Sequence, residues 1–130
     1  MATVIDQICT HLEFLGYETN KTDSGTIRAT HKSYFNIIFK EYGYGVLFSA
    51  FFSSNPTAKS DRKGFLESVN SFNRIARVSR CYIDKDEDIA FEACMPSNYE
   101  KASFGTFMEI FNSDMKNGAH DDVKLFDFLK

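Results

Sequence analysis

The sequence predicts an α+β fold, in which one antiparallel sheet has helices packed against it. Three segments carry apolar residues every three or four positions, which is typical of amphipathic helices. Between them lie short runs rich in β-branched and aromatic residues, bounded by turn residues, which is typical of strands. The predicted order is α-β-β-β-α-β-β-α with a tail. The 130 residues, of which 43% are hydrophobic and 25% charged, fit one compact domain covering residues 1–130.

The first part of the chain is expected to form a helix and a three-stranded meander. Apolar residues recur at helical spacing from Val4 to Leu15, and Gly16 is suited to end that helix. Residues 20–25 have the composition of a turn. The three strands are predicted at Thr26–Thr30, Tyr34–Lys40 and Gly45–Phe52.

The register of the last two strands follows from the loop that joins them. If residues 41–44 form a four-residue loop, Phe39 lies opposite Val46 and Ile37 lies opposite Phe48. These four side chains then share one face, which we expect to be the core face of the sheet.

The second face of the same two strands is also apolar. In this register it pairs Ile38 with Leu47 and Tyr34 with Phe51. A large exposed apolar patch on a globular protein marks an interaction site unless something covers it. We therefore predict a partner-binding surface formed by Tyr34, Ile38, Leu47 and Phe51.

A hairpin is predicted in the second half of the chain. A three-residue turn at 85–87 places Ile83 opposite Ile89 and Arg80 opposite Glu92. The second pair is a cross-strand ion pair worth roughly 0.2 to 1 kcal/mol.

Two helices flank this hairpin, and a tail follows. The helix before it has an apolar stripe made of Phe65, Leu66, Val69, Phe72, Ile75 and Ala76. The helix after it can be capped by residues 96–98, and its apolar set includes Tyr99, Phe104, Phe107, Met108, Phe111 and Met115. The last apolar residues predict a short amphipathic helix at about 121–129.

The second helix and the hairpin carry a family pattern. Val69–Asn73 near the end of the helix, Tyr82–Asp84 at the end of one strand and Asp88–Glu92 in the return strand resemble the YbjN-like family of bacterial sensory transduction regulators. Leu15–Tyr17 and Val46–Phe48 also fit the family, so the resemblance covers nearly the whole chain. It implies a fold similar to type III secretion chaperones and a non-enzymatic domain that binds polypeptides, often as a dimer. One departure is Glu87, where many relatives carry a turn glycine.

No catalytic, cofactor-binding or metal site is predicted. Asp84–Asp88 imitates the start of a calcium loop, but Ile89 and Met95 occupy the positions that require glycine and glutamate, so an acidic hairpin turn is favoured. The three histidines, His11, His31 and His120, lie on different predicted elements without neighbouring ligands, and we expect them at the surface. The common catalytic motifs do not occur, so we expect no enzyme.

Charge and cysteine content constrain partners and location. Residues 59–80 carry four more basic than acidic side chains in a chain of net charge −3. A solvated helix face compensated by the acidic hairpin explains this better than nucleic-acid binding. Cys9, Cys81 and Cys94 are odd in number and lack metal-ligand spacing, so reduced thiols are expected, with Cys81 and Cys94 on opposite faces of the sheet. Without a signal-like N-terminus or a membrane-spanning run, we expect a cytoplasmic protein that binds neither membrane nor nucleic acid.

These observations favour a binding module over other function classes. The leading hypothesis is a chaperone-like or regulatory domain that binds a protein partner of unknown identity, or forms a homodimer, through the apolar outer sheet face. The alternative is a small-ligand sensor with an aromatic-lined pocket, since the chain contains fourteen Phe. An enclosed cavity with convergent polar groups would favour the sensor.

Overall fold

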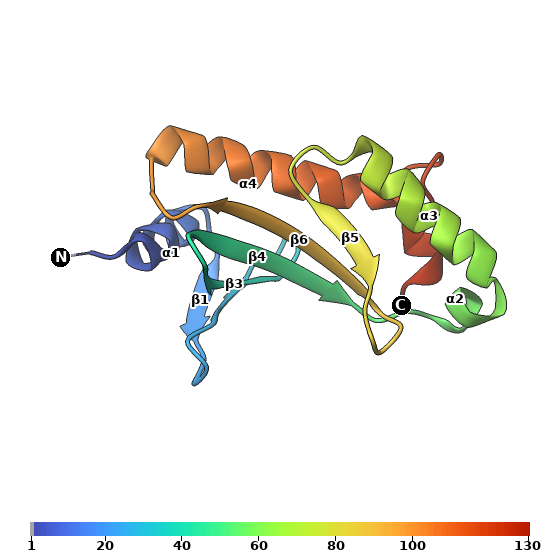
Figure 1. Cartoon of the computed structure of the whole chain (residues 1–130). Helices are drawn as coiled ribbons and strands as arrows, with labels where there is room; N and C mark the ends of the chain where they lie inside the picture. Colours follow the sequence, from blue (N-terminus) through green and yellow to red (C-terminus); the bar gives the residue numbers. More distant parts are fainter. Residues whose placement is uncertain (1) are drawn as a thin grey trace.

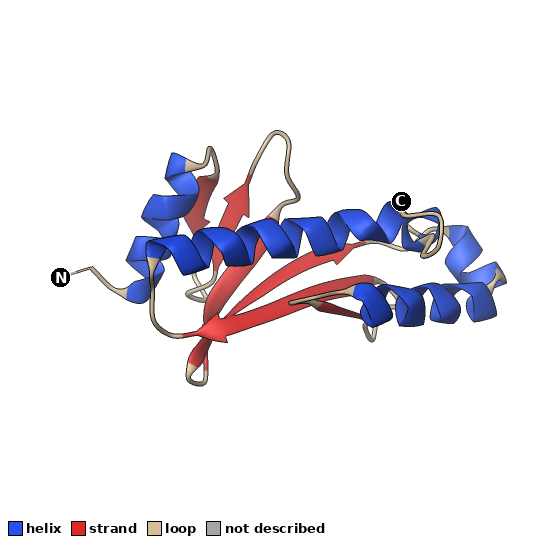
Figure 2. Cartoon of the chain, turned by 90° about the horizontal axis from the view of Figure 1, so that it is seen from above, coloured by secondary structure: helices blue, strands red, loops and turns tan. Residues whose placement is uncertain are grey.

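The computed structural model describes residues 2–130 as helices packed on a six-stranded antiparallel sheet (Figures 1 and 2). The helices are α1 (Val4–Phe14), α2 (Pro56–Ser60), α3 (Arg62–Ile75) and α4 (Lys101–Lys116). The strands are β1 (Glu18–Lys21), β2 (Ile27–Thr30), β3 (Ile37–Tyr42), β4 (Gly45–Phe52), β5 (Arg80–Ile83) and β6 (Ile89–Pro96), in the spatial order β1-β2-β3-β4-β6-β5. Two 3-10 turns, η1 (Asn117–Ala119) and η2 (Leu125–Phe128), end the chain. The predicted α+β class and its antiparallel sheet are confirmed.

Two short elements escaped the sequence prediction. Strand β1 pairs with β2 at the sheet edge. The turn between them is confined to Thr22–Thr26, so the turn predicted at 20–25 included the last residues of β1. The β1 sequence is Glu-Thr-Asn-Lys and mostly exposed, so it shows no alternation of apolar and polar residues. The other element is α2, a single short helix capped by the Asn55 side chain, which accepts from the backbone N–H groups of Thr57 and Ala58.

The predicted register between β3 and β4 was wrong by two residues. Phe39 lies opposite Phe48, and Val46 lies opposite Glu41, because the strands are joined by a two-residue turn rather than a four-residue loop. Gly43 in that turn has a φ of 61°, a left-handed conformation that glycine adopts without steric cost. A shift of two residues keeps every side chain on its own face. Ile37, Phe39, Val46 and Phe48 are therefore buried, as predicted.

The β5–β6 hairpin has the predicted register. Ile83 lies opposite Ile89 and Arg80 opposite Glu92, and the Arg80 guanidinium donates to a Glu92 carboxylate oxygen over 2.9 Å. Glu87 in the turn has a φ of 65°, which agrees with a position suited to glycine. Cys81 is buried and Cys94 exposed, and burial raises the pKa of the Cys81 thiol to about 12.

The core lies between the sheet and its helices and is rich in phenylalanine. Figures 1 and 2 show α3 and α4 lying over the same face of the sheet, with α1 beside the β1 end. Seven Phe side chains are fully buried there: Phe39, Phe48, Phe65, Phe72, Phe91, Phe104 and Phe111. Their interlocked rings account for much of the apolar area removed from water.

The C-terminal tail closes one end of this core without forming the helix expected at about 121–129. It forms the two short 3-10 turns instead, and Lys124 between them has a left-handed φ of 57°, which an α-helix cannot contain. The Phe128 ring stacks on Phe65 with centroids 5.4 Å apart, and Asn55 donates to the backbone carbonyls of Asp127 and Leu129. The tail therefore packs on the helix side of the sheet.

Helix α4 also begins later than the predicted cap at 96–98. Pro96 still belongs to β6, and the helix is capped by Glu100, whose carboxylate accepts from the Ala102 backbone N–H.

Candidate binding surface

The face of the sheet turned away from the core is covered by no helix within residues 2–130 (Figure 1). Pairing across the strands places its side chains in rows. One row contains Arg28, Ile38, Ser49, Glu92 and Arg80, from β2 to β5, and its neighbours contain Lys40, Leu47 and Cys94 on one side and Phe51, Ala90 and Tyr82 on the other. We call this surface the outer face.

Three of the four predicted binding residues lie together on the outer face. Phe51 is 54% exposed, and Ile38 and Leu47 are half-buried. Ile38 and Phe51 line a shallow hollow of about 260 Å³, whose floor includes Ser49. Because of the register shift, Ile38 lies opposite Ser49 and Leu47 lies opposite Lys40, so the predicted pairing of Ile38 with Leu47 is wrong.

Tyr34 does not belong to the outer face, so its predicted position was wrong. It precedes β3 and packs against the His31 ring with centroids 4.7 Å apart, close to Tyr17. The same side chain lines a groove with residues of α1 and α4, which lie on the helix side. The prediction extended the strand three residues too far toward the N-terminus.

Sequence reasoning missed Tyr82 as a member of the outer face. Its hydroxyl donates to one Glu92 carboxylate oxygen over 3.1 Å, while Arg80 occupies the other oxygen. Burial first, and then the bond to Glu92, raise the pKa of Tyr82. The predicted hairpin register already placed Tyr82 on the same face as Glu92, so the signal was present in the sequence.

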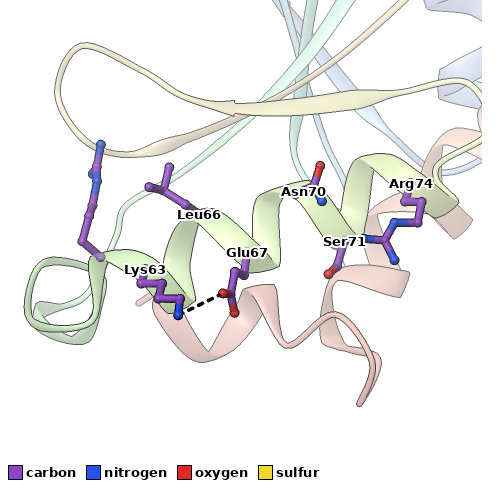
Figure 3. A pocket seen from close by; sticks show the side chains of 7 residues that line it. Lys63, Leu66, Glu67, Asn70, Ser71 and Arg74 are labelled. Atoms are coloured by element: carbon purple, nitrogen blue, oxygen red, sulfur yellow. Dashed lines mark ion pairs between the residues drawn. The ribbon is translucent and has the colours of Figure 1, made fainter.

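Helix α3 offers a second, more polar hollow of about 630 Å³ on its exposed side (Figure 3). Figure 3 shows Lys63 and Glu67 on one flank and Leu66 and Asn70 on the other. Lys63 lies 4.0 Å from Glu67, and Arg62 forms a 2.6 Å ion pair with Glu87 of the hairpin turn. Part of the basic charge of this helix is therefore compensated locally, as expected for a solvated helix face.

A sequence profile of the YbjN family, described as "putative bacterial sensory transduction regulator", matches residues 4–113. The chain belongs to the YbjN family. No curated protein matches its sequence.

Solved structures share the YbjN-family fold at low sequence identity. The crystal structure of YbjN from E. coli is 14% identical, with a TM-score of 0.69 over 97% of this chain and 95% of that one. A chain of the heterodimeric ExoU–SpcU complex of the Pseudomonas aeruginosa type III secretion system is 14% identical, with a TM-score of 0.61 over 95% and 98%. The Yersinia pestis type III secretion chaperone SycH, in complex with a stable fragment of YscM2, is 15% identical, with a TM-score of 0.56 over 89% and 94%.

The YbjN-family residues near the end of α3 fasten the helix to the sheet. The Asn73 side chain binds both backbone groups of Cys81, since it accepts from the Cys81 N–H over 2.8 Å and donates to the Cys81 carbonyl over 3.0 Å. Phe72 beside it is buried against Phe91, with centroids 5.0 Å apart. This part of the family pattern is structural. Asn70, by contrast, lines the exposed hollow of α3.

Asp114 of α4 forms a second fastening that sequence reasoning missed. Its carboxylate is completely buried and accepts from the backbone N–H groups of Arg77, Val78 and Ser79 and from the Ser79 hydroxyl, over 2.8 to 3.1 Å. The loop between α3 and β5 therefore wraps around one carboxylate. Asp114 lies between the apolar residues Phe111 and Met115 in the sequence, and nothing in this position distinguishes it from an acidic residue exposed to solvent.

The acidic turn of this YbjN-family chain uses two of its carboxylates as hydrogen-bond acceptors for nearby protein groups. Asp84 accepts from the backbone N–H groups of Asp86 and Asp88, and Asp88 accepts from the backbone N–H and hydroxyl of Ser54. In the part of the chain that the structure describes, no three His, Cys, Asp or Glu side chains gather as a metal site.

Within the same residues, no helix has the length and apolarity needed to cross a bilayer.

Two of the histidines are half-buried rather than at the surface. His31 accepts from the Ser33 N–H at Nδ1 and lies 3.1 Å from the Leu15 carbonyl at Nε2. His11 of α1 faces α4, with Nδ1 2.7 Å from the Tyr99 hydroxyl and its ring edge-on to Phe104. It borders the groove that Tyr34 lines, an open space of about 400 Å³ rather than an enclosed cavity.

The position of His11 predicts that acid destabilises the protein. Burial, and then the charge of Lys101, lower the pKa of His11 below its ordinary value of 6.5. His11 therefore binds a proton more readily in the unfolded chain than in the folded protein. The free energy of unfolding is highest above pH 6.5, where His11 is neutral in both states, and it falls as the pH drops through the folded pKa. Urea unfolding at pH 7.5 and 5.5 measures the loss.

The matched variant is His11→Gln, which cannot titrate in this range. We expect a smaller drop in unfolding free energy between the two pH values for this variant than for the wild type. Hydrogen bonds lower the pKa values of Asp6 and Glu100 below their ordinary values of 3.8 and 4.5, so both carboxyls stay ionised at the two pH values and do not contribute. Equal drops in both proteins would contradict the role of His11.

Proposed function

We propose that this chain is a non-enzymatic, chaperone-like or regulatory domain that binds a polypeptide partner through its outer face. The observation that carries the proposal is an uncovered sheet face with apolar side chains at its centre, namely Ile38, Leu47 and Phe51. Ser49 is only 6% exposed on this face and lines, with Ile38 and Phe51, the hollow that partner side chains can fill.

The family and the fold support a binding role. The YbjN family carries the name of a regulator, and two structures with this fold are of complexes with a protein partner. Contact between a sheet face and a polypeptide requires no catalytic group. The Cys81 thiol, whose pKa is raised by burial, is turned away from the outer face. A second copy of the chain is one form that the partner can take.

The test replaces Leu47 and Phe51 together with serine. Phe51 is exposed and Leu47 half-buried on an uncovered face, so we expect the double variant to fold, with little loss in unfolding free energy. It should lose its protein partner in affinity capture with mass spectrometry, or its self-association in light scattering. Leu66→Ser is the matched control, because Leu66 is 49% exposed on α3 rather than on the sheet.

Two results would contradict the proposal. An unfolded double variant would mean that both residues belong to the core. A folded double variant that keeps the partners and the mass of the wild type would mean that binding uses another surface.

A further inference from the structure

The outer face carries basic side chains directly beside its apolar ones. Arg28 lies opposite Ile38 on neighbouring strands, and Lys40 lies opposite Leu47. Each cation is therefore the cross-strand neighbour of one central apolar residue, close enough for a single ligand segment to touch both.

These two cations have no carboxylate of their own. Within residues 2–130 neither Arg28 nor Lys40 forms an ion pair, and Lys40 has only a distant contact with the Tyr42 ring, 6.0 Å from its centroid. The third cation of the face, Arg80, is bound to Glu92, which also accepts from Tyr82. Glu92, the acid at the centre of the sheet, therefore already has its hydrogen-bond partners, whereas Arg28 and Lys40 remain available to a ligand.

On the paired strands, the outer face carries Arg28, Lys40 and Arg80 against two acids, which are Glu92 and, on the edge strand β1, Glu18. This small positive surplus has the opposite sign to the whole chain, which has a net charge of −3. An acidic ligand is therefore attracted at this face although the net charge of the chain is negative, an arrangement that guides orientation and register. Helix α3 is also basic, but its Arg62 and Lys63 are paired with Glu87 and Glu67. Arg28 and Lys40 lie on adjacent strands and two positions apart, so their Cα atoms are separated by roughly 8 Å. Carboxylates two residues apart in an extended peptide, or four apart in a helix, have a similar spacing.

We propose that the partner of the outer face is an acidic polypeptide segment that presents carboxylates and apolar anchors on the same face. The anchors fill the depression over Ser49 beside Ile38 and Phe51, and the carboxylates reach Arg28 and Lys40. This inference rests on the proposed function and adds the chemistry of the partner. Phosphate-rich ligands fit less well, because they offer nothing to bury against the apolar centre.

The test uses three synthetic fluorescent peptides with identical Leu and Phe anchors, in which the remaining positions on the anchor face are all Glu, all Gln or all Lys. Fluorescence anisotropy measures their binding to the wild-type protein. We expect the Glu peptide to bind at least tenfold more tightly than the Lys peptide and to weaken several-fold between 50 and 300 mM salt. The double reversal Arg28→Glu/Lys40→Glu should invert the order of the Glu and Lys peptides.

The controls separate this inference from the proposed function. Both reversed residues are exposed, and circular dichroism with a thermal melt checks that the variant folds. Lys63→Glu on α3, whose side chain is 89% exposed, should leave the order of the peptides unchanged.

If the three peptides bind equally and Leu47→Ser/Phe51→Ser abolishes binding, the outer face is the site but the acidic partner is wrong. If the Glu peptide binds as well to Leu47→Ser/Phe51→Ser as to the wild type, the proposed function fails. Absence of Glu-peptide binding up to millimolar concentration, or displacement of that peptide by anionic lipid vesicles in a manner that depends on Arg28 and Lys40, would also overturn the inference.

Discussion

Asp114→Ala is expected to lower the free energy of unfolding by about 3 kcal/mol. A hydrogen bond to a charged group contributes roughly 1.5 to 3 kcal/mol, and a buried donor left without a partner costs about 1 to 3 kcal/mol. Asp114 satisfies three backbone N–H groups and one hydroxyl, all in the loop that connects α3 to β5. Water can reach part of that loop, so the sum of the separate contributions would overstate the loss.

Urea unfolding followed by circular dichroism measures this effect. Ser79→Ala is the matched control, because it removes only the hydroxyl donor and should cost about 1 kcal/mol. Asp114→Asn keeps the shape of the side chain but turns an amide N–H₂ toward donors, and should fall between the two. A loss below about 1 kcal/mol for Asp114→Ala would show that water replaces the carboxylate at little cost.

Phe91→Ala is expected to have the largest effect, a loss of about 4 kcal/mol. Phe91 is completely buried on β6, where its ring packs edge-on to Phe72 of α3 and Phe52 of β4. Its removal takes away the transfer free energy of the ring and leaves a cavity that close-packed neighbours fill only in part.

The same unfolding experiment tests the core prediction, with Phe14→Ala as its control. Phe14 is 84% exposed on α1, so its truncation should change the unfolding free energy by less than about 0.5 kcal/mol. If Phe91→Ala lost less than about 1.5 kcal/mol, the rings around it would have to collapse into the space more freely than a packed core allows.

The parts of the fold that the sequence predicted are those that depend on the periodic spacing of apolar side chains, three to four residues in helices and two in strands. A two-residue error in the β3–β4 register left Phe39 and Val46 on the correct face, because alternation has a period of two. The hairpin register followed from the turn and is correct to the residue. Strand β1 could not be found in this way, since an uncovered edge strand needs no apolar residue.

Side chains that bind backbone groups were the least predictable residues of the candidate site and of the segments packed behind it. Asn73 and Asp114 act on segments eight to thirty-seven residues away, and only the assembled fold brings those groups together. Tyr34 was misplaced for a related reason. The aromatic run that begins there continues the strand pattern, but its ring is held by Tyr17 and His31 outside the ladder.

The contact between Asn73 and Cys81 has a consequence for behaviour at high concentration. Strand β5 is the last strand of the sheet, and such a strand can pair with the same strand of another molecule and start aggregation. The amide of Asn73 already binds both the N–H and the carbonyl of Cys81. These are the backbone groups that a further strand would bind, so intermolecular strand pairing is blocked at Cys81. The opposite edge, β1, is only four residues long and carries Glu18 and Lys21, features that also discourage such pairing.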